Sequence, residues 1–249
     1  MAGLDPHKGM DAIDELGLMV ETHGFRGAAI DPFLAKIPAN HAKYYPIYAK
    51  CCEFDIPVVI STGMATLVDG ADPEHCHPRY IDAVARDFPK LKIVVSHGCY
   101  PWVNEIIMVV QRNRNVYLEL SEYEQSPFSE GYIQAANTMI GDKVIFASAH
   151  PFLDFKGQIA LYRKLPFSPQ ALENIFYNNA ARYFSNTTPS CTGVPAFSLP
   201  AMHRPTKFAA FCTEVSRVSP RTASAARMEA KMSPVPGREA PAMGVETVV

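Results

Sequence analysis

The sequence predicts an α/β fold built on a parallel sheet, and two observations support this. Five short runs rich in β-branched and other apolar residues recur within the first 185 positions, and each is followed by a segment with apolar residues at helical spacing. The runs are apolar at successive positions, without the alternation typical of a sheet that has one face in water. Strands covered by helices on both faces have this pattern, so we expect five successive βα units.

The elements follow one another in regular order. We expect strands at residues 27–32, 56–63, 93–98, 116–121 and 144–149. We expect helices at residues 10–23, 45–52, 80–85, 102–111, 132–140, 158–164 and 169–184. Gly24 marks the end of the first helix, because glycine is common just past a helix C-terminus. Asp154 is expected to cap the helix near Gly157.

Composition bounds the class of protein. The chain has 249 residues, of which 48% are apolar and 19% charged, so it can bury one sizeable core. A net charge of −2 creates no basic field, which makes nucleic acid and anionic membrane poor partners and a small-molecule substrate a better one. No long apolar run and no signal-peptide pattern are found, so we expect a cytoplasmic protein. The six cysteines lack zinc-type spacing and are expected to be free thiols.

The amino-acid composition changes after residue 185. Residues 186–249 contain eight prolines and many Ser, Thr and Ala residues. Such a composition does not bury enough apolar surface to offset the entropy of ordering the chain. We therefore expect one folded domain over residues 1–185, followed by a low-complexity, disordered tail.

The third expected strand ends in a histidine. Residues 93–96 read Ile-Val-Val-Ser and are followed by His97 and Gly98. In parallel α/β folds the chemistry lies at the carboxyl ends of the strands, so His97 is the predicted catalytic residue. An imidazole with an ordinary pKa of about 6.5 suits a general acid or base. The alternative is a buried histidine bonded to a backbone carbonyl.

Further candidates for a pocket lie near other strand ends. Asp31 closes the first strand, although Asp-Pro is also an ordinary turn start. Glu119 alternates into the interior, where a carboxylate is costly unless it is paired or functional. His150 follows the last strand, and Trp102 either lines the pocket or packs its helix on the sheet. Ser61 ends the second strand, where it could join His97 and a carboxylate in metal-free chemistry.

Several short motifs carry a resemblance to a known family. They are Gly24-Phe25-Arg26-Gly27, Asp31-Pro32, Tyr45-Pro46-Ile47-Tyr48, Ile56-Pro57-Val58-Val59-Ile60, Asp87-Phe88-Pro89, Ser96-His97-Gly98, Pro101-Trp102, Pro151-Phe152 and Asn178-Asn179-Ala180-Ala181-Arg182-Tyr183-Phe184. In this order and at these spacings, residues 1–185 resemble the amidohydrolase-related (amidohydrolase 2) family. That family consists of metal-dependent TIM barrels and includes aminocarboxymuconate-semialdehyde decarboxylase and resorcylate-type decarboxylases.

The resemblance implies a partial TIM-type barrel. The family has eight βα units, so the five expected here correspond to strands 4–8 of an N-terminally shortened barrel, with no strand before Met10. The missing first strand carries a His-x-His pair of metal ligands in the family. At two further ligand positions this chain has Ser61 and Ala149, while His97 matches the family's acid–base histidine. The resemblance thus implies a hydrolase or decarboxylase of a small carboxylated or cyclic substrate, with a zinc-type divalent metal implied by the family alone and its site largely lost.

Two alternatives stay open. His75 and His77 could replace the lost pair and assemble a relocated metal site with His97 and His150, or residues 72–78 could simply be a turn that caps the next helix. The chain could also be an inactive family member or fragment that binds a ligand or partner. A partial barrel has unpaired strand edges that need a cover, so we expect a homo-oligomer.

Overall fold

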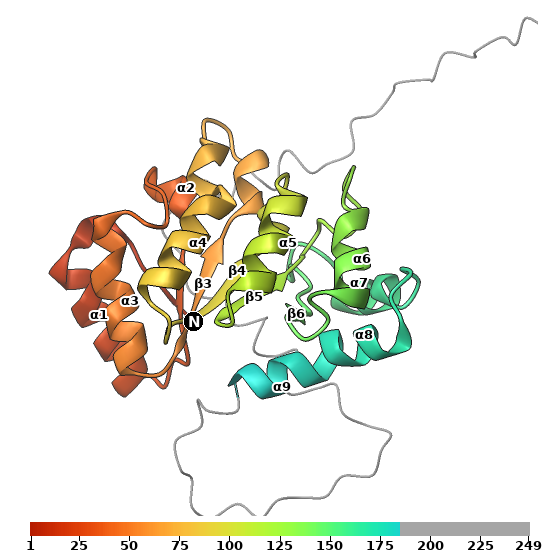
Figure 1. Ribbon diagram of the computed structural model, residues 1–249. Helices are drawn as coiled ribbons and strands as arrows, with labels where there is room; N and C mark the ends of the chain where they lie inside the picture. Colours follow the sequence, from red (N-terminus) through yellow and green to blue (C-terminus); the bar gives the residue numbers. More distant parts are fainter. Residues whose placement is uncertain (185–249) are drawn as a thin grey trace, which may run out of the picture. The chain divides into compact units, whose positions relative to one another are not determined.

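The described part of the chain contains a wholly parallel, six-stranded sheet. The computed structural model describes residues 1–184, and the predicted tail at residues 186–249 lies outside them. The strands follow one another across the sheet in sequence order (Figure 1). They are β1 (Ala2–Gly3), β2 (Ala28–Ile30), β3 (Pro57–Ser61), β4 (Lys92–Ser96), β5 (Val116–Glu119) and β6 (Val144–Ile145). The predicted α/β class with a parallel sheet is confirmed.

The expectation of five strands, with none before Met10, is wrong. The strand β1 pairs with β2 through Ala2 opposite Ala28 and Gly3 opposite Ala29. The backbone N–H of Ala2 donates to Gly27 O at 2.8 Å. Two small residues form no apolar run, so only the pairing with β2 identifies this strand.

Helices and turns connect the strands, but the single helix expected at residues 169–184 is divided in two, and a short helix at residues 32–35 was not expected. The α-helices are α1 (Met10–Glu21), α2 (Pro32–Ala35), α3 (Tyr45–Glu53), α4 (Pro78–Asp87), α5 (Val103–Arg112), α6 (Glu130–Thr138), α7 (Phe155–Tyr162), α8 (Pro169–Glu173) and α9 (Asn179–Phe184). A π-helical turn, η6 (Asn174–Asn178), joins α8 to α9, and 3-10 turns form η1 (Pro6–Lys8), η2 (Ala42–Tyr44), η3 (Gly63–Thr66), η4 (Pro73–Cys76) and η5 (His97–Cys99). The expected cap is confirmed, because Asp154 accepts from Gly157 N at 2.6 Å. Among the described helices, none is both long and apolar enough to span a membrane.

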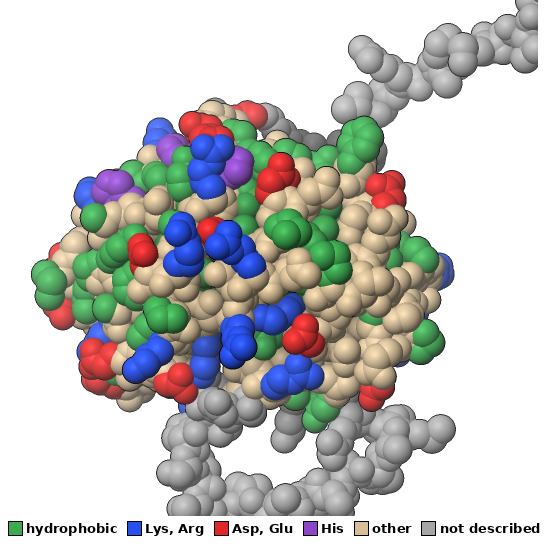
Figure 2. Space-filling model, in the orientation of Figure 1, with side chains coloured by type: hydrophobic (Ala, Val, Ile, Leu, Met, Phe, Trp, Pro, Cys, Tyr) green, Lys and Arg blue, Asp and Glu red, His purple; other side chains and the backbone are tan. Residues whose placement is uncertain are grey.

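Opposite charges alternate on the surface over α4 and α5. Figure 2 shows Lys and Arg side chains on this face with Asp and Glu side chains between them. Asp82 Oδ2 lies 3.2 Å from Arg86 Nε, and Asp82 Oδ1 lies 3.5 Å from Arg112 Nε. Exposed ion pairs of this kind stabilise a fold by less than about 1 kcal/mol each, so the stability of the sheet depends on its core.

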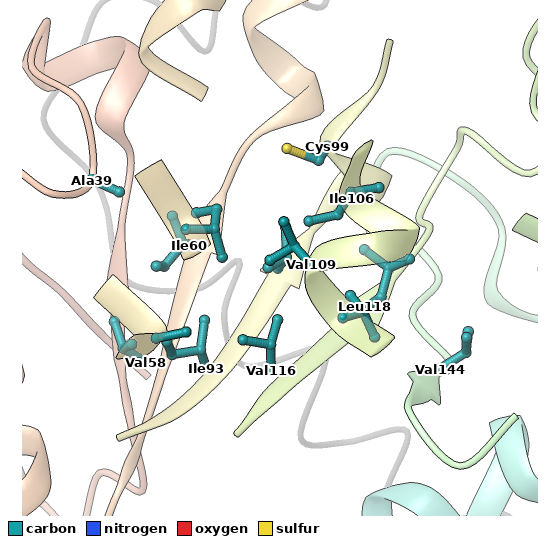
Figure 3. Packing of buried hydrophobic residues seen from close by; sticks show 14 of the residues in the cluster. Ala39, Val58, Ile60, Ile93, Cys99, Ile106, Val109, Val116, Leu118 and Val144 are labelled. Atoms are coloured by element: carbon teal, nitrogen blue, oxygen red, sulfur yellow. The ribbon is translucent and has the colours of Figure 1, made fainter. Parts of the chain in front are cut away.

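The main core lies between the sheet and its helices. Ile60, Ile93 and Leu118 are fully buried there and point from their strands toward the helical layer (Figure 3). Ile106 and Val109 of α5 pack on them. Complete burial of one such side chain contributes about 1.5–3 kcal/mol. Alternate strand residues therefore hold α5 against the sheet.

The opposite face of the sheet is covered by the last helix. Tyr183 of α9 packs on Tyr117 of β5 with ring centroids 4.1 Å apart, and Val94 and Ile145 belong to the same buried cluster. This face lies on the other side of the strands from α5, because successive side chains point to opposite faces.

The edge of β6 is also covered by the C-terminal helices. Phe146 N donates to Ile175 O of η6 at 3.0 Å, and Asn179 Nδ2 donates to Val144 O at 2.7 Å. A further strand would need these same backbone groups. This edge therefore has a cover within the described chain, and it does not require a second subunit.

Candidate active site

Four polar side chains form a row across the carboxyl-terminal part of the sheet. We call them the polar row: Asp31, Ser61, Ser96 and Glu119. The strand register puts them level with one another, because the paired residues are Ile30 and Ile60, Ser61 and Ser96, and Val95 and Leu118. The row continues the face that carries Val59, Val94 and Tyr117, since each is two residues before a member of the row. The structure thus brings three predicted residues together and adds Ser96.

Glu119 is the buried anchor of this row. Its side chain is paired, as a buried carboxylate requires: the hydroxyls of Ser96 and Ser121 donate to it, and His97 N donates at 3.0 Å. The residue is 6% exposed. Hydrogen bonds to an ionised acceptor are stronger than neutral ones, so Glu119 holds the end of β4 firmly.

His97 begins a left-handed turn directly after β4. The φ angles of His97, Gly98 and Cys99 are 61°, 65° and 56°. For residues other than glycine such a conformation costs about 1–3 kcal/mol, and it persists only where the surroundings enforce it. Tyr132 Oη enforces it here by donating to Gly98 O at 2.8 Å. Backbone strain of this kind clusters at functional sites, which supports a role for His97.

The imidazole of His97 is held by one of its two nitrogens. Nδ1 lies 3.3 Å from Ser121 O, so it carries the proton in that hydrogen bond and leaves the lone pair on Nε2. The ring meets Tyr123 edge-on with centroids 6.2 Å apart, and Tyr100 stacks on Tyr123 at 5.0 Å. The contact with Ser121 O is also expected if His97 is a buried histidine with a purely structural role. The half-buried position leaves Nε2 for chemistry, since no hydrogen bond to it is found among the described residues.

Asp31 extends the site to β2. Burial raises the pKa of its carboxyl, while a hydrogen bond from Ser61 and the nearby His97 act in the opposite direction. Glu122, which follows β5, behaves similarly: burial raises the pKa of its carboxyl, and His97 opposes the rise. Both acids therefore interact electrostatically with the predicted catalytic histidine.

Sequence reasoning missed the hydroxyl partners in this site. Ser96, Ser121 and Tyr123 all contact Glu119 or His97, yet serine and tyrosine near strand ends are common without any function. The available signal was the alternation along β4, which puts Ser96 on the face of Val94.

The remaining candidates lie outside the polar row. Trp102 packs against His77 with ring centroids 4.9 Å apart and against a small buried cluster. His77 caps α4 by accepting from Arg79 N at 3.2 Å, which confirms the turn interpretation of residues 72–78. Burial lowers the pKa of His77. His150 lies beyond β6, where its backbone N–H donates to Ser148 Oγ at 3.3 Å.

The donors present do not fit a divalent metal ion. Within residues 1–184, no group of three or more His, Cys, Asp or Glu side chains could hold one, and His75 and His77 belong to no such group. Ser61 offers only a neutral hydroxyl, which is a poor metal ligand, and Ala149 has no donor atom in its side chain. The oxygens of Glu119 accept from N–H and O–H groups instead.

Comparisons with known proteins agree with this architecture. A solved structure of an uncharacterized TIM-barrel protein, Bb4693 from Bordetella bronchiseptica, is 31% identical, with a TM-score of 0.68 over 74% of this chain and 66% of that one. The chain therefore spans just under two thirds of that protein. The 2,6-dihydroxybenzoate decarboxylase from Rhizobium is 16% identical, with a TM-score of 0.59 over 76% of this chain and 71% of that one.

A third neighbour has a metal in its structure. The 5-carboxyvanillate decarboxylase LigW2 from Novosphingobium aromaticivorans, solved with bound manganese, is 18% identical, with a TM-score of 0.56 over 74% of this chain and 64% of that one. At such identities the two decarboxylases show the fold alone. No curated protein matches the chain. The family model described as Amidohydrolase matches residues 1–185, and with it the chain belongs to the amidohydrolase family.

Proposed function

We propose that this protein is an enzyme that moves a proton on a small carboxylated, cyclic substrate, as a hydrolase or decarboxylase with His97 as general acid or base. The observation that carries the proposal is how His97 is held. Glu119 binds its backbone N–H, Ser121 O binds Nδ1, and Nε2 stays available at the end of β4. An imidazole held in one orientation with a free ring nitrogen is suited to proton transfer.

The substrate class is supported by the surroundings of His97. Tyr100 and Tyr123 form a stacked aromatic pair beside its ring. Structural neighbours include decarboxylases of 2,6-dihydroxybenzoate and 5-carboxyvanillate, both aromatic acids. In a decarboxylation the carbon–carbon bond breaks, its electron pair stays on the ring carbon, and that carbon takes up a proton. His97 would supply this proton as the imidazolium: the Nε2–H bond breaks, its electron pair stays on nitrogen, and the neutral ring remains.

We derive no step through a metal, because the described donors do not fit one. Glu119 and Asp31 are already occupied by hydroxyl and amide donors, and a divalent site needs at least three good ligands. We propose that the family's metal site is largely lost in this chain.

The test is carbon dioxide release from 2,6-dihydroxybenzoate and 5-carboxyvanillate, with and without a chelator. We expect His97→Ala to lose about 10²–10⁴-fold of the rate, while His23→Ala, at an exposed histidine, keeps it. Wild-type turnover should survive the chelator. Equal rates for His97→Ala and wild type would refute the role of His97.

A second function is an inactive family member that acts as a binding or oligomerising module. The observation that favours it is the β1 edge, where Gly3 is exposed and no described strand pairs on the outer side. A native mass measurement distinguishes the two. A dimer together with no turnover of either acid supports the module, whereas an active monomer contradicts it.

A further inference from the structure

Asp31 and His97 face the same part of the sheet from strands separated by one neighbour. Asp31 follows β2, Ser61 ends β3, and His97 follows Ser96 at the end of β4. Adjacent strands lie about 4.8 Å apart, so the two backbones are separated by roughly 10 Å, with Ser61 between them. Within the described chain no ion pair joins Asp31 to His97 directly.

The carboxyl of Asp31 does not cap α2, as an aspartate at this position commonly does. Asp31 precedes α2, and such residues commonly accept a backbone N–H of the first turn. Asp5, Asp72 and Asp154 do so in this chain. Asp31 makes no such bond, and the strand register puts it beside Ser61 instead. Its side chain is therefore part of the polar row and not of the helix start.

The groups around Asp31 favour a role in proton transfer. Tyr44 and Cys76 lie near it, and burial raises the pKa of both, that of Cys76 to about 12, so neither is charged at neutral pH. His97 also interacts with Asp31 electrostatically, and this interaction lowers the pKa of the Asp31 carboxyl. Burial raises the pKa of the Asp31 carboxyl above its ordinary value of 3.8, which extends its protonated form to higher pH.

We propose that Asp31 is a second catalytic residue of this site, a proton carrier that works together with His97 across Ser61. The proposal rests on the proposed function. In the acid form, the O–H bond of Asp31 breaks toward a substrate atom, and its electron pair stays on the carboxylate, which the Ser61 hydroxyl stabilises. The proton is restored from the His97 imidazolium, whose N–H bond breaks with its pair left on nitrogen. The pair suits a substrate that gains a proton at one atom and loses one at another.

The first test needs no substrate. Carbon-13 NMR of the side-chain carboxyls follows the titration midpoint of Asp31 in the full-length protein. His97→Ala should raise this midpoint, because the electrostatic interaction that lowers the pKa of Asp31 is removed, and Ser61→Ala should also raise it. His23→Ala should leave it unchanged. His97→Gln serves as a second variant if alanine unfolds the turn. A midpoint that neither His97 variant moves overturns the proposal.

The second test uses carbon dioxide release from 2,6-dihydroxybenzoate. We expect Asp31→Asn, which keeps the shape but cannot carry the proton, to lose about 10²–10⁴-fold in kcat, and Asp31→Glu to recover part of it. The wild-type rate should fall at high pH as Asp31 loses its proton. Asp87→Asn, at an exposed aspartate, is the control. Full activity of Asp31→Asn overturns the proposal. If wild type is inactive, the proposed function fails, and the carboxyl titration alone decides the coupling.

Discussion

Asn179 should contribute strongly to stability, because its amide joins α9 to the edge of β6. Asn179 is fully buried, and its Nδ2 donates to Val144 O at 2.7 Å and to Gly141 O at 3.0 Å. The perturbation is Asn179→Ala. It removes both donors at the edge of the sheet where β6 is the last described strand.

The magnitude follows from the partners that remain. Val144 O loses its amide donor, and a buried carbonyl left unpaired costs about 1–3 kcal/mol. Gly141 O loses less, because Asn174 Nδ2 also donates to it at 3.2 Å. Two effects offset part of the cost: Asn179 Oδ1 has no partner in the described structure, and alanine favours a helix by up to about 0.7 kcal/mol. We expect the free energy of unfolding to fall by about 1–2 kcal/mol.

Urea unfolding followed by circular dichroism measures this change. The midpoint should fall while the slope m stays constant, because the buried area changes little. Asn178→Ala is the matched control, since its Nδ2 donates only to the partly buried Asn174 side chain at 3.1 Å. Asn179→Asp, which turns an oxygen toward Val144 O, should destabilise more than alanine. If Asn179→Ala and Asn178→Ala unfold at the same urea concentration, the proposed link between α9 and β6 is wrong.

Three further changes test the site. Gly98→Ala should lower the thermal unfolding midpoint, because Gly98 has φ +65° and a Cβ there would lie 2.8 Å from the Tyr132 hydroxyl. Gly17→Ala is the control: a Cβ there has free space in α1, so this variant should raise the midpoint. Glu119→Gln should lower the free energy of unfolding in urea by about 1–3 kcal/mol, because it weakens three hydrogen bonds to a buried carboxylate. Glu130→Gln, at an exposed glutamate, should leave the free energy of unfolding nearly unchanged. The carboxyl of Asp31 has a raised pKa, so folding takes up a proton and stability falls as pH rises from 3.8 through the folded-state pKa. Asp31→Asn should remove this fall and be more stable than wild type at pH 7; an unchanged pH dependence would contradict the burial of that carboxyl.

The sequence by itself predicts the layout of the sheet. Runs of apolar residues such as 93–96 and 116–120 report burial on both faces, and the glycines and prolines between them mark the turns. The cap at Asp154 also follows from local sequence, because its acceptor and donor are three residues apart. His97 was found for the same reason, as its place at a strand end is a local property.

The tertiary structure alone decided which side chains meet. Glu119 holds His97 because β4 and β5 pair in one particular register, and Asn179 covers β6 from a helix more than thirty residues away. The strand β1 exists because of its pairing with β2, since its own two residues have no strand signal. Periodicity in a sequence reports the burial of each segment, whereas register and the meeting of distant side chains depend on the packing of all segments together.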